Sequence, residues 1–325
     1  MKRICTAISI ALFCGLVISC AKEKEKKNYE AVNHLKQFSK VRTQTFVLDA
    51  TEFKEITGEQ GTKIYFNRYD LNVSDSDSIV LKLEEYYSFK ELLFNQLQTI
   101  TDKGELLESS GVIKVNFYVN DQEVFLKEGR SLRIEFPKGT LEGNDLYNGE
   151  KDSLNNITWR LQEKTDTIIR INKGTQWQPV IYEIIIDKDS IKFYKDQEVK
   201  RDPLDYVNVA FMKKLNWVNV DKLVTVDGFV SIDLESNLNK MDTYLSCYAI
   251  YESSNAFQLL LLDPDNLKYE NVTVRGTTRL LFIGKSGDTF YSDEFLLEEG
   301  KEIFKKKLNL KKTTLEKFAQ KLDEF

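Results

Sequence analysis

The sequence predicts a mainly β protein with two β-sandwich-like domains, a short helix inserted in the first domain and an amphipathic helix at the C-terminus. Short segments of alternating or continuously apolar residues recur along the chain, and turn residues separate them. Stretches with helical periodicity are few and brief. Strand patterns do not alternate with long helices, which is the arrangement that would indicate a parallel sheet.

The predicted strands of the first domain flank one helix. Ile79–Tyr86 alternates, Gly111–Val119 is a strong apolar strand, and Ser131–Phe136 alternates until a proline stops it. After the first of these strands, Ser88 and Glu91 have the spacing of a capping box, in which each side chain bonds a free backbone N–H of the other residue. This spacing predicts that a helix begins after Ser88.

Strand patterns at the spacing of a second sandwich follow later in the chain. They are Asp227–Leu234, Tyr244–Tyr251, Phe257–Leu262 and Arg279–Ile283. A basic strand, Ile303–Leu310, comes next. Thr313 and Glu316 then form a second capping-box pattern, which opens a terminal helix with Leu315, Phe318 and Leu322 on one face.

These patterns divide the chain into five parts. We expect a lipoprotein signal peptide at 1–19, a lipidated flexible tether at 20–40, a first β-domain at 41–165, a connecting region at 166–205, and a second β-sandwich-like domain with the terminal helix at 206–325.

The N-terminus has the features of a secretion signal. A short basic region precedes Ile4–Ile18, an apolar run too short to cross a bilayer comfortably. The end of this run, Val17-Ile18-Ser19-Cys20, resembles the lipobox of bacterial lipoproteins. The resemblance implies cleavage between Ser19 and Cys20 and attachment of lipid to Cys20; the alternative is a signal that is cut elsewhere. Several acyl chains would anchor the protein stably in the membrane.

The residues after the cysteine refine the expected location. Ala21 stands where inner-membrane lipoproteins carry an aspartate, so the resemblance favours the outer membrane. The charged run at 22–27 cannot bury itself and is expected to be solvated. The sequence leaves open which face of the outer membrane the protein occupies.

Composition excludes several kinds of chemistry. Cys5 and Cys14 leave with the signal and Cys20 carries lipid, so Cys247 has no partner for an intramolecular disulfide. The only histidine, His34, lies on the polar approach to the fold, where an exposed bystander is expected. Ser-His-Asp, Cys-His and histidine-zinc sites therefore have no candidate, and we predict no cofactor and no metal. A net charge of −5 gives no broad basic footprint for nucleic acid.

Chemistry based on oxygen ligands or carboxylates alone is not excluded. Residues 71–78 form an acidic, serine-rich loop, but they lack the glycine and the closing glutamate of an EF-hand, so a solvated turn is favoured over a calcium site. Asp221, Asp227 and Asp233 are acids that a glycosidase-like mechanism could use, although no spacing singles out a pair. Trp159, Trp177 and Trp217 could stack on sugars, whereas a core role is the more usual one.

Two surface features suggest modification or contact. An aspartate, then serine or threonine, then an aliphatic residue resembles the O-glycosylation acceptor of Bacteroidota secreted proteins, and it occurs at Ser78, Ser153, Thr167 and Ser190. The alternative is that these residues simply start strands after turns. A basic cluster could contact an anionic surface, or it could protect a solvated edge strand: Lys305, Lys306, Lys307, Lys311 and Lys312.

Several longer stretches of the sequence are similar to segments of a known protein family. Residues 79–107, 111–113 and 127–132 resemble the ZU5-like β-domain of uncharacterised Bacteroidota cell-envelope lipoproteins, and residues 147–150, 157–159 and 215–221 match segments further along those proteins. The resemblance covers most of 60–225 and implies a β architecture and an envelope location. Some animal ZU5 domains cut themselves at a His-Phe-Ser sequence, which this chain lacks.

Two functions follow as hypotheses. The first is a lipid-anchored, non-catalytic envelope protein, held at the membrane by its N-terminal lipid, which binds or scaffolds an envelope protein or a glycan. The second is a carboxylate-dependent envelope hydrolase, with glycans as the candidate substrate. No catalytic residue is assigned for either function.

Overall fold

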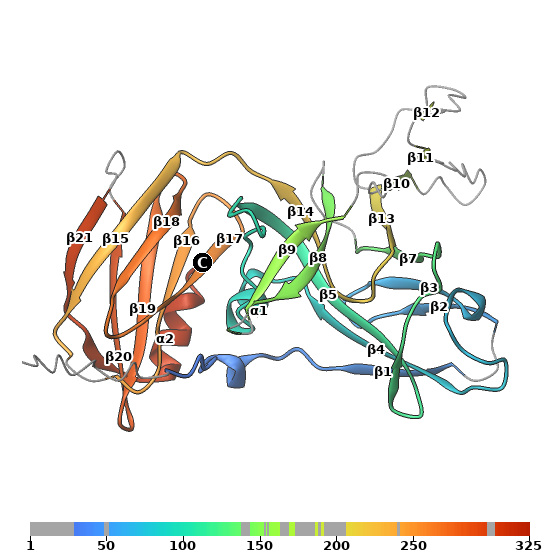
Figure 1. The fold of residues 1–325 in the computed structure, drawn as a ribbon, viewed down its shortest axis with the longest axis horizontal. Helices are drawn as coiled ribbons and strands as arrows, with labels where there is room; N and C mark the ends of the chain where they lie inside the picture. The colour runs from blue at the N-terminus through green and yellow to red at the C-terminus, as the bar shows by residue number, and fades with distance from the viewer. Residues whose placement is uncertain are drawn as a thin grey trace, which may run out of the picture.

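The computed structural model describes residues 29–48, 52–137, 144–152, 154, 156–162, 169–172, 186–187, 190–191, 206–238, 241–297 and 303–325. It confirms the mainly β fold, with β-sandwich-like domains and short helices (Figure 1). The larger sheet of the first domain has the order β1–β4–β5–β14–β8–β9, and β6 pairs with β5. These strands are β1 (Gln44–Leu48), β4 (Ile79–Tyr86), β5 (Leu107–Val119), β6 (Gln122–Val124), β8 (Asp145–Lys151), β9 (Ile157–Leu161) and β14 (Asn216–Leu223).

A second sheet, with the order β10–β13–β7–β3–β2, packs against the first. Its strands are β2 (Phe53–Thr57), β3 (Lys63–Asn67), β7 (Leu132–Glu135), β10 (Ile169–Asn172) and β13 (Tyr206–Met212). Alternate residues of both sheets, such as Leu83, Phe117 and Ile134, are buried between them in one apolar cluster. A separate small pair joins β11 (Ile186–Asp187) to β12 (Ser190–Ile191).

The second domain is also a sandwich. One sheet has the order β18–β15–β21, and the other has the order β17–β16–β19–β20–β22. The strands are β15 (Gly228–Ser236), β16 (Leu245–Tyr251), β17 (Ala256–Leu262), β18 (Lys268–Val274), β19 (Thr278–Ser286), β20 (Thr289–Leu296), β21 (Ile303–Leu308) and β22 (Lys311–Thr313). Cys247 is completely buried in the core between the sheets, where burial raises the pKa of its thiol. β15 and β21 pair in parallel, which no sequence pattern indicated.

Residues 206–223, which we expected at the start of the second domain, form β13 and β14 in the sheets of the first. β14 lies between β5 and β8, and β13 pairs with β7. The predicted boundary at 205/206 therefore differs from the sheet pairing, which puts the crossing to the second domain at 224–227, between β14 and β15. Pairing between strands far apart in sequence decides this placement, and local periodicity does not report it.

The two helices begin at side-chain caps. Ser88 and Glu91 form the predicted capping box at the start of α1 (Phe89–Phe94). At the C-terminus, α2 (Leu315–Leu322) starts one residue later than expected, because Thr314, and not Thr313, accepts the hydrogen bond from Lys317 N. Single 3₁₀ turns form η1 (Lys36–Phe38) and η2 (Arg68–Asp70).

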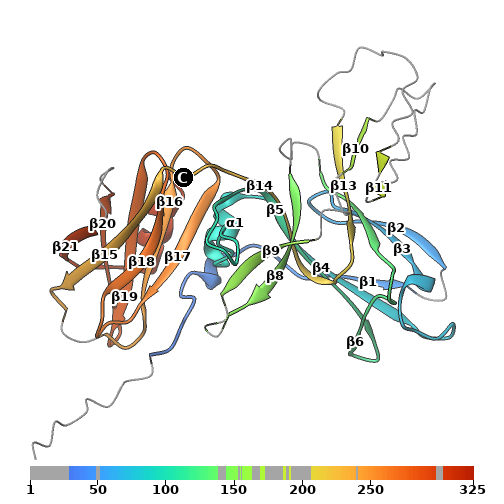
Figure 2. The same ribbon diagram turned by 45° about the horizontal axis from the view of Figure 1, so that its top comes forward.

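A third apolar cluster joins the domains. Figure 2 shows α1 between them. The outer face of the β5–β14–β8–β9 region contributes Trp159, α1 contributes Leu93, and the outer face of β17–β16–β19 contributes Phe257. The segment 96–101 adds hydrogen bonds across the boundary, since Thr99 N donates to Phe257 O at 2.9 Å and Gln98 Oε1 accepts from Leu259 N at 3.1 Å. The domains therefore share a continuous core.

The chain enters the fold through a segment that contacts both domains. Tyr29 packs on Tyr244 of the second domain, with ring centroids 6.0 Å apart, and Glu30 forms a β-bridge with Thr243. Further on, Leu35 is completely buried in the cluster between the domains. The flexible tether that we expected at 20–40 therefore does not extend through 29–40, because the apolar side chains around Leu35 anchor this part.

Candidate functional site

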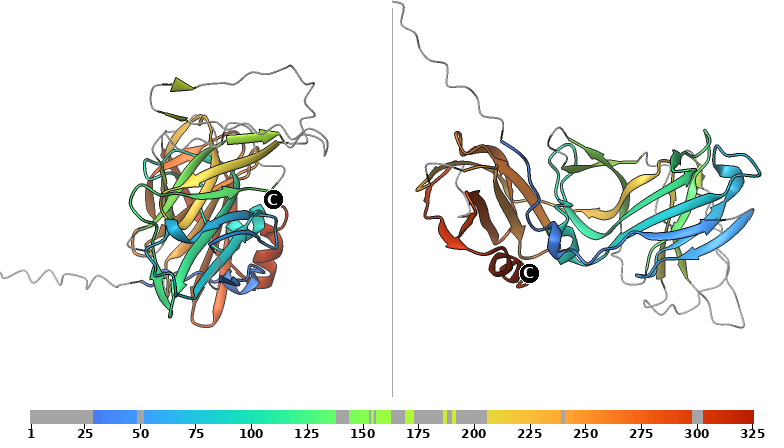
Figure 3. Two further views of the ribbon diagram at one scale, coloured as in Figure 1. Left: turned by 90° about the vertical axis from the view of Figure 1, so that its right-hand side faces the viewer. Right: turned by 90° about the horizontal axis from the view of Figure 1, so that it is seen from below.

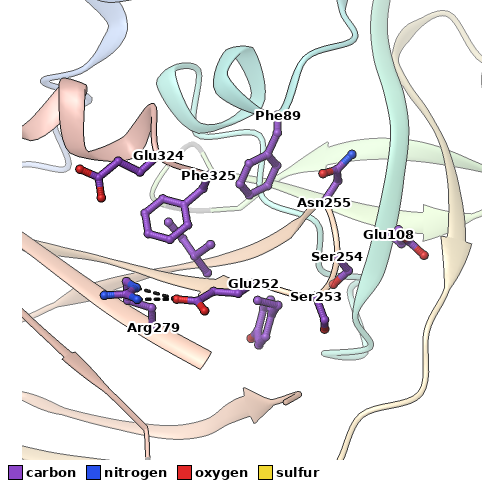
Figure 4. Close-up of a pocket in the computed structure, with 11 residues that line it drawn as sticks. Phe89, Glu108, Glu252, Ser253, Ser254, Asn255, Arg279, Glu324 and Phe325 are labelled. Carbon is purple, nitrogen blue, oxygen red and sulfur yellow. Dashed lines mark hydrogen bonds and ion pairs between the residues drawn. The ribbon is translucent and has the colours of Figure 1, made fainter. Parts of the chain in front are cut away.

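The candidate site is a groove between the domains, with a volume of about 540 Å³ (Figure 4). The β16–β17 turn supplies Ser253, Ser254 and Asn255. α1 supplies Phe89, and the end of the chain supplies Phe325. The groove exists because the shared core brings the β16–β17 turn next to α1 and the start of β5, where Ser109 N donates to Asn255 O at 3.1 Å. The view from below shows the two domains side by side (Figure 3).

A charged pair lies on the floor of the groove. Both Nε and Nη2 of Arg279 are 2.7 Å from Oε1 of Glu252, and the two side chains are each about one-third exposed. The guanidinium also lies 5.5 Å from the centroid of the Phe325 ring. Charge-assisted bonds of this kind hold a planar cation in a fixed orientation, so the floor presents a rigid polar surface beside an aromatic ring.

The rim combines polar and aromatic groups. Phe89 packs edge-on against Phe257, with centroids 5.9 Å apart, so that its ring is fixed at the mouth. The Ser254 hydroxyl is buried and has no hydrogen-bond partner among the described residues. A buried, unsatisfied hydroxyl beside a cavity is a group that a ligand or water can satisfy.

Three carboxylates line the groove, but they are not arranged as a facing pair. Glu324 and Glu108 lie at opposite ends of the view in Figure 4, and Glu252 between them is bound to Arg279. Glycosidases place an acid and a second carboxylate on the two sides of the bond they cut. The arrangement fits recognition of a polar ligand better than this chemistry.

The acids that the sequence singled out lie apart from the groove, and each has its own partners. Asp227 accepts from Gly276 N at 2.6 Å, and Asp233 lies 3.3 Å from the ammonium of Lys268. Asp221 is completely buried on β14.

Asp221 occupies a polar cluster within the first domain. A bulge at Ser110 and Gly111 of β5 leaves the Ser110 N–H free to donate to Asp221 Oδ1 at 3.2 Å. Gly111 has a φ of +143°, and the ring of Tyr87 lies against it where a Cβ would stand. Asn219 Nδ2 donates to the other carboxyl oxygen. Burial raises the pKa of Asp221 to about 8, against the opposing effect of its hydrogen bonds.

The residues predicted for modification or surface contact come from separate parts of the chain. Ser78 is exposed, directly before β4, and Ser190 begins β12; Ser153 and Thr167 lie outside the described residues, as do Ser19 and Cys20. The lysine cluster occupies the edge strands β21 and β22, with Lys305, Lys306, Lys307, Lys311 and Lys312 exposed. This is the place expected for lysines that protect a sheet edge.

Other predicted residues have structural partners. The acidic loop at 71–78 is a turn held by Arg68, whose guanidinium donates to the carbonyls of Ser74 and Asp77 at 2.8 and 2.7 Å. His34 is half-buried instead of exposed, with its ring 5.0 Å from that of Phe290, because its segment packs at the domain junction. Burial, and then Lys285, lower its pKa.

Both described tryptophans pack at the cluster between the domains. Trp159 is completely buried and donates from Nε1 to Gln98 O at 2.6 Å. Trp217 is partly buried against the same cluster, and Trp177 lies outside the described residues. The sequence did not predict the groove, because its residues come from segments that only the tertiary fold brings together; the Ser-Ser-Asn turn was its one local signal.

Comparisons with known proteins do not assign the chain to a family. No protein-family model, no curated protein and no solved structure matches the chain. Within the described residues, no cluster of three or more histidine, cysteine, aspartate or glutamate side chains is placed to hold a metal ion. No helix in the described part of the chain is both long and apolar enough to cross a membrane.

Proposed function

We propose that the protein is a lipid-anchored protein of the cell envelope, with an outer-membrane location, and that its paired sandwiches form a non-catalytic binding or scaffolding module. The groove between the domains is the proposed binding surface. The observation that carries this proposal is the combination, in one groove, of the fixed Arg279–Glu252 pair, the Phe89 and Phe325 rings and an unsatisfied Ser254 hydroxyl.

The lipid anchor rests on the lipobox-like sequence that ends at Cys20. The Cys20→Ala variant is expected to move the protein from the membrane fraction to the soluble fraction and to leave its fold intact, because the described strands, helices and apolar clusters are built from residues after 28. Fractionation of cells, with metabolic labelling by a fatty acid, measures both effects. A Cys20→Ala protein that is cleaved normally and stays in the membrane would show that the anchor is elsewhere.

The groove is tested by photo-crosslinking in intact cells. A photoreactive amino acid replaces Ser253 in the groove, and in a matched variant it replaces Phe229, which is 54% exposed in the same domain but lies outside the groove. One discrete adduct of higher mass is expected from position 253 and none from position 229. Equal adducts at both positions, or none at 253, would reject the groove as the binding surface and leave the anchor untouched.

A further inference from the structure

A second surface of the first domain carries a regular array of polar side chains. It is a depression of about 410 Å³ on the outer face of β1, β4 and β5. The strand register sets Thr45 beside Lys82 and Lys82 beside Asn116, while Glu84 stands beside Lys114. Alternation within strands puts these side chains on the face opposite the sandwich core.

The array holds its donors and acceptors in place through hydrogen bonds. Glu84 accepts from Thr43 Oγ1 at 2.9 Å and from the Tyr86 hydroxyl at 2.5 Å. Lys114 Nζ lies 4.0 Å from Glu84, and Asn116 donates to Glu123 of the adjoining β6. Glu84 and Lys114 are 20% and 33% exposed, so they are oriented by their neighbours but still reach solvent.

Aromatic rings lie at two places along the array. Lys82 Nζ is 4.5 Å from the centroid of the Tyr118 ring, and Lys114 Nζ is 5.2 Å from that of Trp217. Trp217 pairs with Lys114 across the strands, four residues from Tyr118, which corresponds to roughly 13 Å along β5. Trp217 is partly buried against Tyr86 at the end of the array, whereas Tyr118 is the ring that lines the depression.

We propose that this face binds a neutral oligosaccharide. A sugar ring has an apolar face, which stacks on an aromatic side chain, and an edge of hydroxyls, which bond to both donors and acceptors. The described charges facing the depression balance, with Lys82 and Lys114 against Glu84 and Glu123. Such a surface lacks the excess positive charge that an acidic polymer or a phosphate-rich ligand would need.

The test uses the detergent-solubilised full chain and calorimetric titration with neutral hexasaccharides, namely cellohexaose, mannohexaose and maltohexaose. We expect one or more of them to bind. Tyr118→Ala is expected to weaken that binding about tenfold, whereas Tyr118→Phe, which keeps the ring, leaves it nearly unchanged. Tyr69→Ala is the control, because Tyr69 is 45% exposed on η2 and lies outside the depression.

Three results would overturn the proposal. They are no binding of any neutral hexasaccharide, equal loss of binding in the Tyr118 and Tyr69 alanine variants, and binding only of an acidic probe such as oligogalacturonate. The proposal does not depend on the groove. The chain with the photoreactive residue at Ser253 should bind the hexasaccharide as the unaltered chain does, so failure at one surface is distinguishable from failure at the other.

Discussion

Replacing Asp221 with asparagine is expected to stabilise the protein at pH 8 and above by several kcal/mol and to flatten the dependence of its stability on pH. The carboxyl is completely buried, and burial raises its folded-state pKa to about 8, well above the ordinary value for an aspartate. The folded state therefore binds a proton that the unfolded state has released. Stability is fully present below about pH 4 and is lost progressively as the pH rises to about 8, at roughly 1.4 kcal/mol per unit.

The asparagine variant keeps the local hydrogen bonds without a titrating group. Its side-chain oxygen can accept from Ser110 N. Once the Asn219 amide turns over, the new amide can donate to Asn219 Oδ1, which has no partner among the described residues, in place of the bond that Asn219 Nδ2 now donates to Asp221. Urea unfolding between pH 4 and pH 9 measures the difference. Asp145→Asn is the matched control, since Asp145 pairs directly with Asp221 across the sheet but is exposed. Parallel curves for Asp221→Asn and the unaltered chain would mean that Asp221 does not set the pH dependence.

Truncating Phe257 to alanine is expected to uncouple the two domains. Phe257 is completely buried in the shared core, where its ring lies 5.9 Å from Phe89 and 6.2 Å from Tyr248. Removing a buried phenylalanine costs about 3–5 kcal/mol, and here the loss falls on the junction. Scanning calorimetry should therefore show two separate unfolding transitions for the variant, in place of the one transition expected for the unaltered chain.

A second truncation distinguishes the junction from a general loss of core. Phe282 is equally buried, but it lies between the sheets of the second domain, where it stacks on Phe295 at 5.0 Å. Phe282→Ala is expected to lower the stability of the second domain by a similar amount without loosening the groove between the domains. If Phe282→Ala separated the transitions as strongly as Phe257→Ala, the shared core would not be what couples the domains.

The sequence predicted those elements whose signals are local. The strand Ile79–Tyr86 has the expected bounds, because its alternating residues bury one face. The capping box at Ser88 formed because both partners lie within one helical turn. For the terminal helix, consecutive threonines offered two caps, and sequence spacing alone favoured Thr313 over the actual cap, Thr314.

Features that depend on pairing across the chain were beyond local patterns. β14 lies beside β5, although more than half of the first domain separates the two strands in the sequence, and its other neighbour is β8. The parallel pairing of β15 with β21 likewise joins the two ends of the second domain. The burial of Asp221 follows from the same placement together with the bulge opposite it. In the candidate groove, Arg279 meets Glu252 and Phe325 because the strands and the C-terminus converge there.

The entry segment decides which domain a membrane tether would reach first. Because Tyr29 and Glu30 contact the second domain, a lipid at Cys20 would connect to the C-terminal sandwich first, although it is the later domain in the sequence. Tension on the anchor would break the Glu30–Thr243 bridge before the force reached β1. Mechanical tension would therefore act first on the contacts of the entry segment and only afterwards on the core of either domain.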